Sequence, residues 1–207
     1  MEIDVTRPNK LYRYSEKKFL DRSLILGEFR LRPASDYTAI EKDIARQDNE
    51  LVRTHKSPAS SVTIENIRTG ERAQPIGDVV YRSETRTNYL TICFSKQWDE
   101  KLFEVFPDTD ACLIIHNVDE FCERVHFAVE KALPQWAGMD APIVYFGSSK
   151  LGAVFSKPRR FFYQHEWRFA WLPITTRKHI EPITISIGNI ENIAEIVELA
   201  SNMKYET

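Results

Sequence analysis

Two polar side chains on an aromatic segment are the clearest candidates for chemistry in this sequence. Polar and aromatic residues alternate across residues 163–169, which is typical of a β-strand. Because successive side chains of a strand point to opposite faces, Gln164, Glu166 and Arg168 share one face and the aromatic residues share the core face. Gln164 and Glu166 would lie about 7 Å apart on that strand, close enough to act on one ligand. This spacing predicts a catalytic pair, although Glu166 and Arg168 could instead form an ordinary ion pair on an exposed face.

Two further strands each carry one polar residue in an apolar or aromatic setting. Arg13 lies between Tyr12 and Tyr14, and Ser95 ends the apolar run 89–95. Arg13 is a candidate for ligand binding, and Ser95 is a candidate for catalysis. The alternative for Arg13 is a surface position on an edge strand, and the alternative for Ser95 is a cap of the next helix.

The elements that must position these residues form an α+β pattern. Strands outnumber helices and do not alternate regularly with them, so we predict one α+β domain over residues 1–207 rather than a doubly wound sheet. The predicted strands are 10–14, 28–32, 61–68, 79–86, 89–95, 111–116, 143–146, 164–172 and 183–187, and the predicted helices are 16–22, 36–53, 98–106, 118–133 and 190–200.

Residues 60–88 are predicted to form a protruding β-hairpin. Two alternating segments flank the turn signal Thr69-Gly70-Glu71, and the hairpin is polar and rich in arginine. Arg82 and Arg86 on this hairpin could contact nucleic acid, with Lys157, Arg159 and Arg160 as a second basic patch.

Composition excludes several classes of protein. The chain has 43% hydrophobic residues, 28% charged residues and a net charge of −2, which predicts a folded protein without strong non-specific affinity for nucleic acid. There is no glycine-rich phosphate loop, no apolar run of membrane-spanning length and no signal peptide. Three cysteines without a Cys-x-x-Cys pair and five scattered histidines predict reduced thiols, no metal site and a cytoplasmic location.

The order of these polar residues resembles that of the ADP-ribosyltransferase fold. Its members carry a strand Arg or His, a strand Ser or Tyr, and a strand Glu often written Gln/Glu-x-Glu, matched here by Arg13, Ser95 and Gln164-x-Glu166. The segments 11–14 and 93–95, followed by Lys157 and then by Glu166-Trp167-Arg168, are similar to a large uncharacterised family of bacterial domains. The resemblance spans residues 11 to about 172.

The resemblance implies a single domain with mixed and antiparallel sheets in a split sandwich with flanking helices. It also implies that the chain binds NAD as its substrate and is an ADP-ribosyltransferase or an NAD glycohydrolase, with a protein, a nucleic acid or water as acceptor. A bacterial toxin or a phage-defence effector is the setting that it suggests. The implied catalytic residues are Glu166, Gln164 and Ser95, and the implied cofactor-binding residues are Arg13, Tyr14, Ser95, Phe94, Tyr89, Lys157 and Arg168.

Two other functions remain open from the sequence. One is a nucleic-acid-binding or nucleic-acid-processing module that uses the arginine-rich hairpin and the basic loop. The other is a catalytically silent scaffold of the same fold that binds a partner protein.

Overall fold

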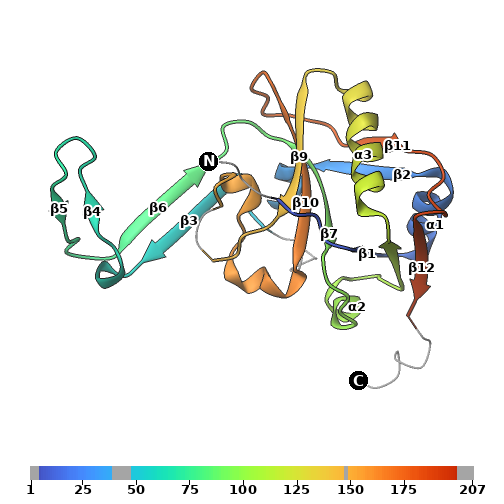
Figure 1. Ribbon diagram of the computed structural model, residues 1–207, viewed down its shortest axis with the longest axis horizontal. Coiled ribbons are helices and arrows are strands. Elements are labelled where there is room, and N and C mark those ends of the chain that lie inside the picture. Colours follow the sequence, from blue (N-terminus) through green and yellow to red (C-terminus); the bar gives the residue numbers. More distant parts are fainter. Residues whose placement is uncertain (1–4, 39–47, 147–148, 200–207) are drawn as a thin grey trace.

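The computed structural model describes residues 5–38, 48–146 and 149–199. The protein is α+β, with mostly antiparallel strands and few helices, and an arm projects from its body (Figure 1). The strands are β1 (Leu11–Ser15), β2 (Glu28–Pro33), β3 (Val52–Ser57), β4 (Ile64–Glu65), β5 (Arg72–Ala73), β6 (Val79–Glu84), β7 (Leu90–Ser95), β8 (Ala111–Ile115), β9 (Trp136–Pro142), β10 (Glu166–Pro173), β11 (Ile183–Ser186) and β12 (Ala194–Glu198). The α-helices are α1 (Lys17–Leu26), α2 (Lys101–Val105) and α3 (Val118–Ala132), and 3₁₀ turns cover Ala34–Thr38, Ala59–Ser61, Ala153–Phe155 and Arg159–Gln164.

The main sheet forks at β7. Along one edge, β10 pairs with the whole of β7, from Glu166 opposite Ser95 to Trp171 opposite Leu90. The other edge of β7 is shared, because β2 pairs near its start and β1 pairs only at Ser95. The sheet continues from β1 to β8 and β12, and from β2 to β11. Two branches of one sheet therefore diverge from β7, which confirms the strand predicted at 89–95.

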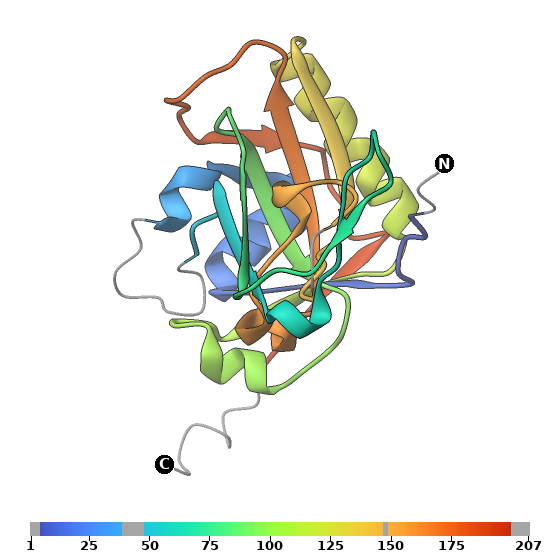
Figure 2. The same cartoon turned by 90° about the vertical axis from the view of Figure 1, so that its left-hand side faces the viewer.

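The hydrophobic core lies between the sheet and α3. The alternation of β10 directs Trp167, Phe169 and Trp171 into this core, as the sequence predicted. Phe94 and Phe121 join Phe169 there, and their ring centroids lie between 5.3 and 6.0 Å apart in edge-to-face geometry. Figure 2 shows α3 alongside the sheet, where its apolar stripe packs against this aromatic cluster.

Several elements differ from the sequence-based predictions. Residues 143–146 are not a strand; β9 lies just before them, at 136–142, and pairs with β10. Residues 194–198 form a strand on the open edge of β8 instead of a helix, because sheet pairing outweighs a short helical periodicity there. The predicted helix 36–53 is also wrong where it is described, since 34–38 is a 3₁₀ turn and 52–57 is β3; its centre lies outside the described residues.

The predicted hairpin exists with different strand partners. We call residues 52–84 the arm; in it β6 pairs with β3, from Val79 opposite Ser57 to Glu84 opposite Val52, and not with residues 61–68. The small β4–β5 ribbon forms the tip, where Gly70 adopts a positive φ of 72° and its N–H donates to the carbonyl of Asn66. The arm therefore begins about eight residues earlier than predicted.

A buried carboxylate ties the N-terminal segment to α3 and β9. Asp140 accepts hydrogen bonds from His126, from the indole N–H of Trp167 and from the guanidinium of Arg7. Burial alone would raise the pKa of Asp140, but the hydrogen bonds from His126 and Arg7 outweigh it and lower the pKa to about 2. Because this pKa lies below that of the unfolded chain, Asp140 stabilises the fold above the unfolded value, and its contribution is lost as the pH falls toward 2.

We expect Asp140→Asn to lower the free energy of unfolding by about 2 kcal/mol at neutral pH and to flatten its dependence on pH below about 4. Urea unfolding at several pH values measures both effects. Asp119→Asn is the matched control, because Asp119 also contacts Arg7 but is largely exposed. Equal acid sensitivity of the Asp140→Asn variant and the native chain would contradict this role for Asp140.

Candidate functional site

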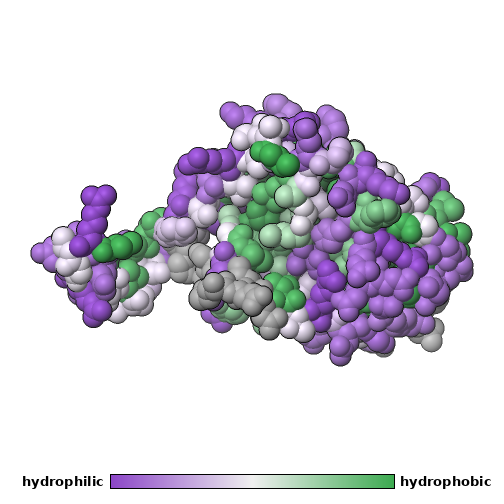
Figure 3. Space-filling view, turned by 45° about the horizontal axis from the view of Figure 1, so that its top comes forward, coloured by the Kyte–Doolittle hydropathy of each residue, from purple (hydrophilic) through white to green (hydrophobic). Residues whose placement is uncertain are grey.

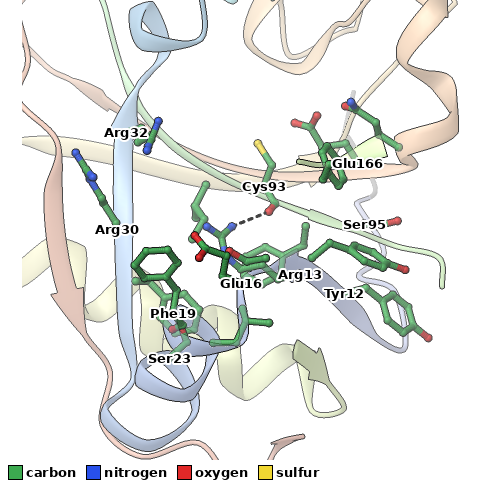
Figure 4. A pocket seen from close by; sticks show the side chains of 18 of the residues that line it. Tyr12, Arg13, Glu16, Phe19, Ser23, Arg30, Arg32, Cys93, Ser95 and Glu166 are labelled. Atoms are coloured by element: carbon green, nitrogen blue, oxygen red, sulfur yellow. Dashed lines mark hydrogen bonds between the residues drawn. The ribbon is translucent and has the colours of Figure 1, made fainter. Parts of the chain in front are cut away.

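A cavity of about 860 Å³ opens where β1 and β2 diverge from β7. Its walls come from β1, α1, β2 and β7, from the start of β10 and from the residues preceding it. In Figure 4, Arg30 and Arg32 project from β2 on one side, Cys93 and Glu166 lie on the other, and Arg13 lies between them. A cavity of this size accommodates a ligand as large as a dinucleotide.

Glu166 is a buried acidic residue on the cavity wall, held by two cations. Its side chain is 4% exposed, and its two carboxylate oxygens have different cationic partners. Oε1 accepts from Arg168 Nε at 2.7 Å, and Oε2 accepts from Lys157 Nζ at 2.9 Å. Burial raises the pKa of Glu166, but the charges of Arg168 and Lys157 outweigh it and hold the pKa well below the usual range of a glutamate. Glu166 is therefore a fixed, ionised carboxylate.

Gln164 lies beside Glu166, as predicted, but not on the same strand. It ends a 3₁₀ turn instead of lying on β10, and His165 follows it with a positive φ of 43°. Lys157 Nζ donates hydrogen bonds to Gln164 Oε1 at 2.8 Å and to the carboxylate of Glu166. One ammonium group therefore holds the side chains of Gln164 and Glu166 next to each other. The structure thus brings together Gln164, Glu166 and Lys157 on the cavity wall, as the sequence reasoning required, without a shared strand face.

Arg168 lies behind Glu166 and not on the cavity wall. It is fully buried and also binds both carboxylate oxygens of Glu50, at 2.5 and 2.9 Å, and the carbonyl of Val154 at 2.7 Å. Arg53 completes the network through Glu50, at 2.8 Å. The guanidinium donors of Arg168, predicted to bind a cofactor, are directed in this structure to these internal groups, and Arg168 does not line the cavity.

Arg13 lies in the fork itself. Its guanidinium donates to the carbonyl of Cys93 at 3.1 Å and lies over the ring of Phe94. Cys93 belongs to the part of β7 between the residues that pair with β2 and with β1. Arg13 therefore donates a hydrogen bond to a backbone carbonyl that the fork leaves without a strand partner. It also lines the cavity.

The other predicted site residues divide into two groups. Tyr14, Phe94 and Ser95 line the cavity, and all three are also committed to the structure. Tyr14 accepts from the N–H of Asp99, Phe94 packs in the core, and the hydroxyl of Ser95 closes a turn by donating to the carbonyl of Gln97. Tyr89 is fully buried behind the cavity, where its hydroxyl accepts from Arg168 at 3.3 Å.

Sequence reasoning missed four residues of this site. Arg30 and Arg32 were predicted only as alternating positions of a strand, yet both line the cavity. Neither has a hydrogen bond or ion pair within the described part of the chain. Glu50 and Tyr37 lie in or beside a segment predicted as a helix, and only their long-range contacts reveal them. The alternation Arg30-Leu31-Arg32 was the one available signal for the two arginines.

Of the three residues in the basic loop proposed as a nucleic-acid patch, Lys157 is removed from solvent, whereas Arg159 and Arg160 are exposed. Lys157 is buried, and Arg159 and Arg160 lie over the rings of Phe146 and Phe161. On the arm, Arg82 approaches Glu84 at 3.5 Å. The cavity brings together more of the predicted site residues than either basic surface, and it is therefore the candidate site developed below.

The fold and the cavity define an α+β protein with a forked antiparallel sheet. No family model, curated protein or solved structure matches this chain with significant similarity. Within residues 5–38, 48–146 and 149–199, no helix is long and apolar enough to cross a membrane, and no group of three or more His, Cys, Asp and Glu is arranged to hold a metal ion. Burial raises the pKa of the Cys93 thiol to about 12, so at neutral pH this cavity residue is not a thiolate.

We expect Arg168→Met to lower the free energy of unfolding by roughly 3 to 5 kcal/mol, because it leaves Glu50 and Glu166 buried without their shared cation. Chemical denaturation measures the change. Arg159→Met, the same substitution at an exposed position, is the control and should change stability by less than about 1 kcal/mol. Similar losses in the two variants would show that the buried network does not hold the fold together.

Proposed function

We propose that the cavity binds NAD and that the protein cleaves its nicotinamide–ribose bond, transferring ADP-ribose to water or to an acceptor. One observation carries this proposal: a fixed, ionised carboxylate faces the same cavity of about 860 Å³ as two guanidinium groups that have no ion pair among the described residues. The resemblance to the ADP-ribosyltransferase fold supports the same assignment for Arg13 and Glu166.

The arginines account for binding of the anionic part of the ligand. Arg30 and Arg32 project from β2 into the cavity, and Arg13 lies between β2 and Glu166 (Figure 4). A pyrophosphate presents several oxyanions to which guanidinium groups donate paired hydrogen bonds. The ligand then lies with its phosphates toward β2 and its reacting ribose toward Glu166.

Glu166 accounts for the chemical step. When the bond between ribose C1′ and the nicotinamide nitrogen breaks, the electron pair goes to nicotinamide, which leaves as a neutral molecule. Positive charge develops on C1′ and the ring oxygen, as in glycoside hydrolysis, and a fixed carboxylate stabilises it. Water or an acceptor hydroxyl then bonds to C1′ and releases its proton to solvent. Gln164, held beside Glu166 by Lys157, orients that nucleophile.

We expect Glu166→Gln to reduce the rate of nicotinamide release about 10²- to 10³-fold, because a neutral amide stabilises the developing cation less. Chromatographic detection of nicotinamide from NAD measures the rate. Glu166→Asp keeps a negative charge beside Lys157 and Arg168. Comparing its stability and turnover with those of Glu166→Gln therefore shows whether lost activity comes from unfolding or from the missing carboxylate. Glu104→Gln on the exposed side of α2 is the matched control. Unchanged turnover in a folded Glu166→Gln variant would exclude Glu166 as the catalytic carboxylate.

Arg32→Gln should weaken NAD binding about 10- to 100-fold while leaving thermal stability unchanged, since the guanidinium of Arg32 has no ion pair to lose among the described residues. Calorimetric titration with NAD measures affinity. Arg159→Gln serves as a control outside the cavity. Equal affinity of the Arg32 and Arg159 variants would remove β2 from the binding site, and absence of NAD binding to the native chain would overturn the proposed function.

The dependence of turnover on pH follows from the ion pairs of Glu166. Because its pKa is held well below the usual range, Glu166 stays ionised in mildly acidic solution. We expect nicotinamide release to show no loss attributable to a carboxylate between about pH 8 and about pH 5, where a glutamate in solution would begin to protonate. A rate that falls with an apparent pKa near 5 would assign the essential group to a different residue.

A further inference from the structure

The arm is a prominent part of the molecule that the proposed function does not use. It projects from the body (Figure 1), and Figure 3 shows hydrophobic atoms along it. Ile67 and Ile76 at its outer end are fully exposed, and Val80 and Tyr81 on β6 are more than half exposed. Among the described residues β3 and β6 pair only with each other, and an isolated two-stranded ribbon is marginally stable in water. The apolar surface and the open edges indicate a site of protein association.

The charge of the arm argues against nucleic acid as the partner. Three of its basic residues form ion pairs within the arm: Lys56 with Asp78, Arg72 with Glu65, and Arg82 with Glu84. Over residues 52–84 the basic side chains are nearly balanced by acidic ones: Arg53, Lys56, Arg68, Arg72 and Arg82 against Glu65, Glu71, Asp78 and Glu84. Such a surface lacks the excess of cations that binding to phosphate requires.

The backbone pattern shows which groups of β6 are available. The N–H of Thr85 donates to the carbonyl of Leu51, which identifies this pair as one that exchanges hydrogen bonds. In an antiparallel ladder such pairs alternate with pairs that do not. Val80, Arg82 and Glu84 therefore turn their N–H and C=O groups away from β3, toward the open edge of β6.

The side chains on that edge of β6 are complementary to themselves. If two copies pair antiparallel about an axis at Val80, Val80 lies opposite itself and Asp78 of each copy lies opposite Arg82 of the other. These two side chains then add a contact across the pair to the ones they make within their own arm, with Lys56 and Glu84. Moving the axis to Tyr81 sets Asp78 opposite Glu84, and moving it to Arg82 sets two guanidinium groups together. The edge of β3 is different, because it has no acidic residue to face a basic one and the N–H of Val52 already donates to Asn49.

We propose that two copies of this chain associate through the outer edges of β6, forming a continuous four-stranded sheet with Val80 at the two-fold axis. The partner that covers the apolar surface of the arm is thus a second copy of this chain. Both copies use the same surface, so the assembly ends at a dimer. Ile76 of each copy lies beside the arm of the other, which covers part of the exposed apolar surface. This inference is independent of what the cavity binds.

Proline substitutions distinguish the two edges of the arm. Val80→Pro removes an N–H that points away from β3, so it blocks the outer edge of β6 while leaving the β3–β6 ladder in place. Thr54→Pro does the same on the outer edge of β3 and is the matched control. Sedimentation of the full chain over a range of concentrations should show a dimer for the native protein and for Thr54→Pro, and a monomer for Val80→Pro. A native chain that stays monomeric at about 100 µM, or equal dimerisation of the two variants, would overturn the proposal.

Charge reversal tests the register. Asp78→Arg should weaken dimerisation at least about tenfold by facing Arg82 of the second copy, and Asp78→Arg combined with Arg82→Asp should restore it, since the pair is only inverted. Circular dichroism checks that each variant is folded. A dimer unaffected by Asp78→Arg, or one that the double substitution fails to restore, would exclude the register centred on Val80.

Discussion

The buried ion network around Arg168 is the constraint on which the site depends. Its guanidinium is fully buried, so it needs both Glu50 and Glu166 to offset the cost of removing its charge from water. Glu50 and Arg168 belong to segments more than a hundred residues apart, and the Val154 carbonyl adds a third segment. Pairing of the Arg168 guanidinium therefore fixes three segments relative to one another: the residues just before the arm, the 3₁₀ turn at Ala153–Phe155 and the start of β10. The orientation of Glu166 in the cavity is a consequence of this packing.

The cavity itself follows from the fork in the sheet. β10 occupies one edge of β7 completely, whereas the opposite edge is divided between β2 and β1. Helix α1 connects β1 to β2 with little loop between them, so the two strands remain neighbours in sequence while diverging in space. A fork in a sheet exposes backbone acceptors, and Arg13 satisfies one of them at the Cys93 carbonyl. The same side chain can thus hold the fork in place and face a ligand.

Local pattern was enough to predict the elements that carry strong periodicity, and long-range pairing decided the rest. The apolar run that became β7, the amphipathic α3 and the alternation of β10 were all identified from sequence, because each is buried on a face that its own residues define. β12 and β3 were missed, since both are half-exposed and owe their conformation to a neighbouring strand. Glu166 was found from its place on an aromatic strand, whereas Glu50 carries no local signal and is recognisable only through Arg168.

The ion pairs of Glu166 suggest how binding and chemistry divide between residues. Lys157 and Arg168 compensate the charges of Glu50 and Glu166, so this part of the wall offers a ligand little net charge. Arg30 and Arg32 have no such compensation among the described residues, and attraction of an anionic ligand would therefore come mainly from β2. Each carboxylate oxygen of Glu166 accepts one hydrogen bond from a cation, and the thiol of Cys93 is a further hydrogen-bond partner of this carboxylate. Arginines on one wall would thus supply affinity, and a pre-oriented carboxylate on the other would act only as positive charge develops beside it.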